Sequence, residues 1–124
     1  VVYDIGAFHG ILTLYFSQSA KVVISYEPNS HNNNRLHENL RLNGITNVTV
    51  RKIGIGSEPK NARMFFSRLM PGGASVEPNA AAQIAQQSAD ASSEEIQITT
   101  LDQDIREHAL PVPDFVKIDI EGFE

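Results

Sequence analysis

The chain has 124 residues, 41% of them hydrophobic and 20% charged, which is the size and composition of one globular domain. A formal net charge of −5 argues against an extended basic surface for nucleic acid or for an anionic membrane. The sequence has no cysteine, which excludes disulfides and thiolate chemistry and fits a reducing compartment, so we expect a cytoplasmic protein. No apolar stretch approaches the roughly 18 residues of a membrane span.

Four apolar runs have the composition of strands, and helix-like segments separate the first three. A helical pattern covers about 11–19, and a second runs from an N-cap at Asn29 or Ser30 to the terminating pair Asn43-Gly44. This alternation predicts an α/β fold with a mainly parallel sheet between covering helices, a three-layer αβα arrangement. The strand-like runs are 1–5, 22–26, 48–53 and 115–120.

The segment 70–95 is rich in Ala, Gln and Ser and poor in large apolar residues. This composition is typical of a loop insertion on the surface, with a short helix at 79–88. A loop that closes over a substrate is the alternative, because long loops in compact domains often carry function. On either side of the segment, 62–67 and 96–100 are predicted to pair as extra strands.

A short helix is expected to begin near Thr100, before the last strand-like run. The mixed polarity of 48–53 is typical of an edge strand, whereas 22–26 and 115–120 are apolar enough to be covered on both faces. If the strand order is third, second, first, fourth, the fourth strand is central only when further strands follow it. The sequence therefore predicts that 1–124 is a single truncated domain, the amino-terminal portion of its fold with about the first four core strands.

The first strand-like run leads into DIGAFHG, residues 4–10. A dinucleotide-binding turn needs G-x-G-x-x-G, and Phe8 occupies the place of the second glycine, where its side chain would block a pyrophosphate. No lysine follows Gly10, so the phosphate-binding pattern G-x-x-x-x-G-K-[ST] also fails. Gly6 allows a sharp turn, and the carboxylate of Asp4 suits a ligand with ammonium and sulfonium charges. The turn predicts a nucleoside that is smaller and less negative than a dinucleotide.

A second acid, Glu27, ends the second strand-like run. A carboxylate at that position can accept hydrogen bonds from both hydroxyls of a ribose. Taken singly, Asp4 could cap a helix and Glu27 could be an exposed loop acid. At the ends of adjacent parallel strands they would face one crevice, where ligands bind in such sheets. We therefore expect both acids in one ligand site.

Charged and apolar residues alternate in the last strand-like run. Lys117, Asp119 and Glu121 fall on one side, and Ile118 and Ile120 fall on the other. Charges on one face of an apolar strand cost free energy unless they are paired or line a cleft. One interpretation is an ion pair from Lys117 to either acid; the other places the strand end at a reacting centre.

Four blocks, VVYDIGAFHG, YEPNSHNNNRLHENLRLNG, ITTLDQDI and FVKIDIEGFE, together resemble the FkbM-type methyltransferases, in the family's order. The similarity covers nearly the whole chain, and the segment 70–95 departs from the family pattern. The resemblance implies a Rossmann-like methyltransferase fold and S-adenosylmethionine as cofactor. It also implies methyl transfer, most often to an oxygen, with a sugar, a secondary metabolite or another small molecule as acceptor.

The resemblance also implies roles for single residues. Asp119 or Glu121 would act as the base at the reacting centre, with Lys117 tuning their charge. His9 is a weaker candidate for the base, because a loop or cap role fits its position. Two carboxylates do not make a convincing Mg²⁺ site, so no metal ligand is assigned. The implied cofactor-binding residues are Asp4, Gly6, Ala7, Gly10, Glu27, Pro28, Asn29, Ile53 and Gly54.

Two other functions compete with methyl transfer. A nucleotide-dependent oxidoreductase is disfavoured by Phe8 in the glycine turn. A catalytically silent module for nucleotide binding or partner recognition would keep the fold and lack cofactor affinity. The intact Asp4, Gly6, Gly10 and Glu27 argue against such a module.

Overall fold

The computed structural model describes residues 1–67, 74–76, 82 and 90–120. Its elements in chain order are β1 (Val2–Ile5), α1 (Ile11–Ser17), β2 (Val23–Tyr26), α2 (Ser30–Leu42), β3 (Val48–Arg51), β4 (Gly54–Ile55), β5 (Lys60–Ser67), β6 (Ala91–Thr99), α4 (Leu101–Glu107) and β7 (Phe115–Ile118). None of the described helices is long and apolar enough to cross a membrane.

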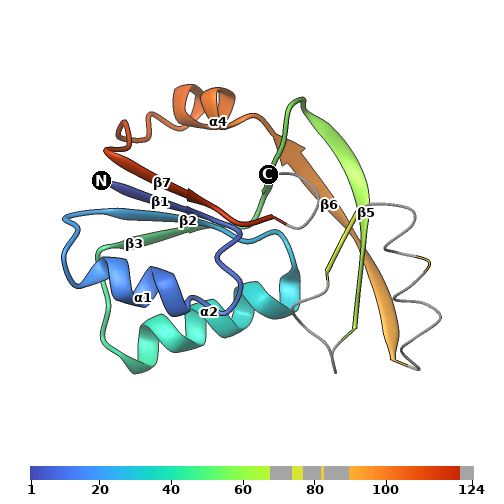
Figure 1. The fold of residues 1–124 in the computed structure, drawn as a ribbon, viewed down its shortest axis with the longest axis horizontal. Coiled ribbons are helices and arrows are strands. Elements are labelled where there is room, and N and C mark those ends of the chain that lie inside the picture. The colour runs from blue at the N-terminus through green and yellow to red at the C-terminus, as the bar shows by residue number, and fades with distance from the viewer. Residues whose placement is uncertain (68–73, 77–81, 83–89, 121–124) are drawn as a thin grey trace.

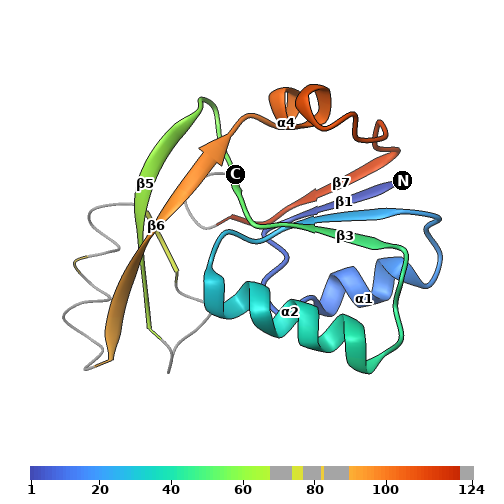
Figure 2. The same ribbon diagram turned by 180° about the vertical axis from the view of Figure 1, so that it is seen from behind.

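The main sheet has four strands in the order β3-β2-β1-β7, and every neighbouring pair is parallel. Helices α1 and α2 cover one face of this sheet and α4 lies over the other (Figure 1). The predicted α/β class and the parallel sheet are confirmed, and the strand order is the one that the sequence analysis considered, third, second, first, fourth. The carboxyl ends of β1 and β2 therefore meet at one edge, which the opposite view also shows (Figure 2).

A second sheet of three strands, in the order β4-β6-β5, stands at this carboxyl edge (Figures 1 and 2). Strands β5 and β6 pair antiparallel and β4 is parallel to β6. The prediction of two paired extra strands is thus confirmed, but the register differs, because 62–67 pair with 91–96 and only Ile96 of the predicted partner segment 96–100 takes part. Strand β6 begins at Ala91, so 91–95 form a strand although the sequence placed them in the loop insertion. The helix predicted at 79–88 lies outside the described residues apart from Ala82.

The core follows the alternation of side chains along β1 and β2. Tyr3, Ile5, Ile24 and Tyr26 are buried together on the face that α4 covers. On the other face, Asp4 is fully buried. A second apolar cluster, below the glycine turn, contains Ala7, Leu36 and Leu40.

The helix ends lie close to their predicted positions because local hydrogen bonds fix them. Asn29 caps α2, since its side-chain oxygen accepts from the Asn32 N–H at 3.0 Å. Gly44 ends that segment with a φ of 64°, a conformation that glycine adopts without strain. Thr100 caps α4 through a 3.2 Å bond from the Gln103 N–H.

Strand β7 differs from the prediction that both of its faces are covered. Phe115 is 54% exposed and Ile118 is 53% exposed. Among the described strands, β7 pairs only with β1 and forms an edge of the sheet. The prediction was wrong here because apolar composition alone does not distinguish a central strand from an edge strand.

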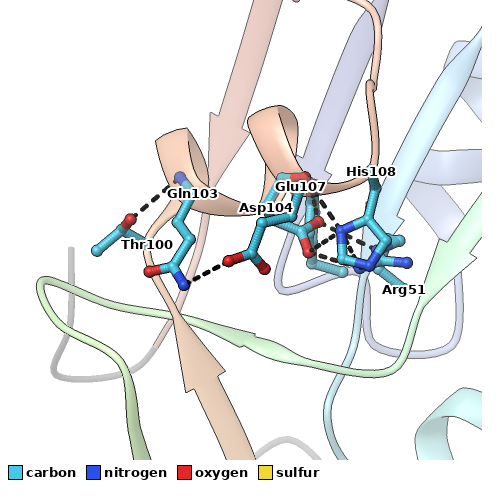
Figure 3. A network of polar contacts seen from close by, with 7 residues as sticks. Arg51, Thr100, Gln103, Asp104, Glu107 and His108 are labelled. Atoms are coloured by element: carbon cyan, nitrogen blue, oxygen red, sulfur yellow. Dashed lines mark hydrogen bonds and ion pairs between the residues drawn. The ribbon is translucent and has the colours of Figure 1, made fainter.

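A buried ion pair fastens α4 to the main sheet (Figure 3). Asp104 accepts from the Tyr26 hydroxyl at 3.0 Å and from Arg51 at 3.1 Å (Nε) and 2.5 Å (Nη2). The His108 ring nitrogen lies 3.2 Å from the same carboxylate. Burial and the neighbouring carboxylate raise the pKa of Tyr26, so its hydroxyl stays a donor. One aspartate thus joins α4, β2 and β3.

We predict that Asp104→Ala lowers the free energy of unfolding by about 3 kcal/mol, because Arg51 and the Tyr26 hydroxyl would lose their buried acceptor. Urea denaturation measures the change. Gln103→Ala on the same helix is the matched control, since it removes only an exposed 2.8 Å bond to Glu107 and should change stability by less than about 0.5 kcal/mol. Equal stability of the two variants would contradict the role assigned to Asp104.

Candidate cofactor site

An apolar pocket lies where the carboxyl ends of β1 and β2 face the second sheet. Its volume is about 470 Å³ including its open mouth. Four predicted cofactor residues line it: Gly6, Pro28, Ile53 and Gly54. The other lining residues are Ile5, Tyr26, Ile55, Met64, Ala74, Ser75, Val76, Ile96, Ile98 and Ile120.

The sequence analysis did not predict that the second sheet forms one wall of the pocket. Met64 comes from β5, and Ile96 and Ile98 come from β6; these three side chains form a buried cluster. The alternation Ile96-x-Ile98 is the pattern of a strand with one apolar face, and it is the sequence signal that could have pointed to this wall. It could not show that this face closes the crevice at the end of β1, because that contact joins distant parts of the chain.

The glycine turn between β1 and α1 is held by backbone hydrogen bonds. The N–H groups of Gly6 and Ala7 both donate to the Tyr26 carbonyl, at 3.1 and 3.0 Å. Gly6 has a φ of 76° and Gly10 a φ of 87°. A Cβ on Gly6 would collide with the carbonyl oxygen of Asp119. Glycine is therefore required at Gly6 both by its dihedral angle and by the close approach of the chain after β7.

Phe8 occupies this turn with a φ of 53°, in the left-handed region that bulky residues rarely adopt. Its ring stacks on His9 with centroids 3.8 Å apart. The His9 Nε2 atom is buried, without a hydrogen-bond partner among the described residues, and burial lowers the pKa of the ring. The stack fits a local packing role for His9, and neither residue lines the apolar pocket.

Glu27 connects the end of β2 to the glycine turn. Its Oε2 accepts from the Phe8 N–H at 2.8 Å and its Oε1 accepts from the Asn29 N–H at 3.0 Å. The side chain is only 6% exposed, and this burial raises the pKa of the carboxyl to about 7 although the two backbone donors oppose the shift. Glu27 lies beside the pocket, adjacent to Pro28 in its wall, and is not itself a lining residue.

Asn29 is fixed at the start of α2 by its cap. The side chain is almost completely buried. Its Nδ2 atom has no hydrogen-bond partner among the described residues. A buried amide donor without a partner costs free energy, and Asn29 is not among the residues that line the apolar pocket.

Asp4 lies under the turn, outside the pocket lining. Its Oδ2 accepts from the Thr13 hydroxyl at 2.6 Å, and that hydroxyl lies 2.9 Å from the Ser25 hydroxyl. Its Oδ1 is 3.1 Å from the Lys117 ammonium, an ion pair whose angles do not make a hydrogen bond. Asp4 and Glu27 therefore hold the turn from different sides, and neither acid lines the pocket, although the sequence predicted both in one ligand site.

The end of β7 reaches the same turn. The Lys117 side chain is 16% exposed, and its Nζ donates to the Gly6 carbonyl at 2.8 Å. Asp119 is 72% exposed, 3.8 Å from that Nζ, and its N–H donates to Ile5 at 3.1 Å. Glu121 lies outside the described residues. Within the described ranges, no three His, Asp or Glu side chains are grouped as metal ligands.

The parallel sheet, the glycine turn after β1 and the pocket at the carboxyl edge together define a Rossmann-like α/β domain with a ligand crevice. The family model described as "Methyltransferase FkbM domain" matches residues 4–124. The chain belongs to this family of methyltransferases.

One solved structure shares this fold over nearly the whole chain. The crystal structure of methyltransferase FkbM from Methylobacillus flagellatus KT matches with a TM-score of 0.60 and 22% sequence identity, over 98% of this chain and 26% of that chain. This chain thus spans about a quarter of that protein's length. The YcgJ protein from Bacillus subtilis matches at 26% identity and a TM-score of 0.39, over 40% of this chain and 21% of the other. No curated protein matches.

We predict that Glu27 makes the protein less stable as pH rises from about 4.5 to 7. The unfolded carboxyl loses its proton near 4.5 and the folded one near 7, so the contribution is complete below 4.5 and is lost through this window. The loss is at most about 3 kcal/mol. Urea denaturation at several pH values measures it against Glu27→Gln, which cannot titrate. Parallel pH profiles for the two proteins would contradict the assignment.

Proposed function

We propose that the protein transfers a methyl group from S-adenosylmethionine to a hydroxyl of a sugar, a secondary metabolite or another small molecule. The observation that carries this proposal is the apolar pocket at the carboxyl ends of β1 and β2, which contains Gly6, Pro28, Ile53 and Gly54. Membership of a methyltransferase family supports the reaction class. A cytoplasmic location belongs to the same proposal, because the cysteine-free sequence fits a reducing compartment.

The residues at the pocket fit an adenosyl group. A flat apolar base suits walls of Ile53, Ile96 and Ile98, which bury apolar area without offering a charge. Each carboxylate oxygen of Glu27 has one backbone donor, and a carboxylate oxygen can accept further bonds. We assign Glu27 to the ribose hydroxyls on this ground.

The charge balance also favours this cofactor over a dinucleotide. The buried carboxyl of Glu27 binds the Phe8 N–H of the turn, and because its pKa is about 7 it is partly charged at neutral pH and would repel a pyrophosphate there. When bound, S-adenosylmethionine supplies a methyl group on a positively charged sulfur. The turn would hold the bound cofactor in one orientation. Correct orientation of two reactants can lower an activation barrier by roughly 7–11 kcal/mol.

Asp119 is our candidate for the base. Its carboxylate is exposed, and the next residue, Ile120, lines the pocket. An acceptor hydroxyl bound at this rim would give its proton to the carboxylate, a contribution of about 10²–10⁴-fold to the rate. Glu121, two residues later in the sequence, lies outside the described residues and shares the assignment. Lys117 points beneath the turn, so we assign it no proton transfer.

We predict selective binding of S-adenosylhomocysteine over NAD in calorimetric titrations of the full-length protein. Ala74→Trp fills the pocket and should weaken binding at least tenfold, about 1.4 kcal/mol. Ala62→Trp is the matched control, because Ala62 packs on the same apolar cluster and does not line the pocket. A folded protein that binds neither compound would instead support the silent binding module.

We predict that Asp119→Asn lowers methyl transfer about 10²–10⁴-fold and leaves the affinity for S-adenosylhomocysteine within about twofold. The assay follows consumption of the methyl donor with a panel of sugars and hydroxylated metabolites. Asp102→Asn is the control, since Asp102 is an exposed aspartate on α4. Normal turnover of Asp119→Asn would remove it as the base and leave Glu121.

A further inference from the structure

The Lys117 ammonium lies against the glycine turn on the side of Asp4, away from the apolar pocket. Its Nζ donates to the Gly6 carbonyl at 2.8 Å and lies 3.5 Å from the Ile5 carbonyl oxygen. The same atom is 3.1 Å from the fully buried Asp4 carboxylate. The exposed Asp119 is farther away, at 3.8 Å. The Nζ atom therefore donates to two backbone carbonyls beneath the turn and forms an ion pair with the Asp4 carboxylate.

This contact controls one peptide group of the pocket wall. Gly6 lines the pocket, and the peptide group that links Gly6 to Ala7 is bonded on the β2 side, because the Ala7 N–H donates to the Tyr26 carbonyl at 3.0 Å. Lys117 holds the Gly6 carbonyl on the β7 side. Glycine has a wide choice of backbone conformations, so bonds on both sides are what select one orientation of its peptide planes.

Asp4 explains why a lysine can occupy this largely buried position, where its side chain is 16% exposed. A buried ammonium needs a countercharge, and Asp4 lies opposite Lys117 in the register of β1 and β7. Asp4 is itself held by the Thr13 hydroxyl of α1. The pair thus joins β7, β1 and the first helix beneath the turn.

We propose that Lys117 is a positioning residue for the cofactor: its ammonium fixes the Gly6 carbonyl, with Asp4 as its buried countercharge. This inference rests on the proposed function. It replaces the expectation that Lys117 tunes the catalytic carboxylates, because its shorter contacts are to the turn. Removing the ammonium should loosen the Gly6 peptide and weaken cofactor binding, independently of the effect on folding.

The test separates positioning from stability with a double variant of the full-length protein. Lys117→Met leaves Asp4 buried without a countercharge and should lower both thermal stability and affinity for S-adenosylhomocysteine, the latter at least tenfold. Asp4→Asn combined with Lys117→Met removes the uncompensated charge and should regain most of the lost stability, but not the affinity. Lys21→Met, an exposed lysine just before β2, should leave both unchanged.

Hydrogen exchange at the Gly6 and Ala7 amides provides a readout that needs no ligand. Both amides should exchange faster in the stable double variant than in the wild type. Recovery of affinity together with stability in the double variant would overturn the proposal, as would wild-type affinity of Lys117→Met. If the folded wild type does not bind S-adenosylhomocysteine, the proposed function fails, and unchanged amide exchange in the double variant then overturns the positioning role.

Discussion

The close approach of Asp119 to Gly6 is the constraint on which the site depends. The carbonyl oxygen of Asp119 occupies the space that a Cβ on Gly6 would fill, and its N–H bonds to the Ile5 carbonyl. The end of β7 therefore lies directly against the turn between β1 and α1. This contact places Ile120 in the wall of the pocket that the ends of β1 and β2 form. It also brings the Asp119 carboxylate close to that pocket. A side chain at Gly6 would separate the two segments.

Polar and apolar groups are divided between the two sides of the glycine turn. The pocket side is apolar, with walls from β4, β5 and β6. Beneath the turn, Asp4, Thr13 and Lys117 form a buried polar cluster, and Glu27 binds two backbone donors beside it. Buried charged groups are a costly way to hold a turn, because each carboxylate loses its hydration. Three charged side chains, Asp4, Glu27 and Lys117, surround this one turn, which indicates that they maintain its geometry.

The sequence predicted the elements that depend on local patterns. Asn29 as a cap, Gly44 as a helix end and the parallel order of the main sheet follow from spacing and composition. The side-chain environments were less predictable. Alternation placed Lys117 and Asp119 on one face, but only the pairing of β7 with β1 shows that Lys117 meets the buried Asp4. Ile118 is exposed because β7 forms an edge of the described sheet. An apolar run in the sequence does not indicate whether a strand has one neighbour or two.

The second sheet is tied to the cofactor turn through the start of α2. Glu94 of β6 accepts from the Ser30 N–H at 2.7 Å and from the Ser30 hydroxyl at 2.6 Å. Ser30 follows Asn29, whose N–H binds Glu27, so the same few residues hold the apolar wall and the buried carboxylate. The charge of Glu94 also contributes to the raised pKa of Glu27. Moving β6 away from α2 would therefore open the pocket. It would also remove the Glu94 charge that helps to raise the pKa of Glu27. The position of the pocket wall and the pKa of the buried acid are therefore coupled.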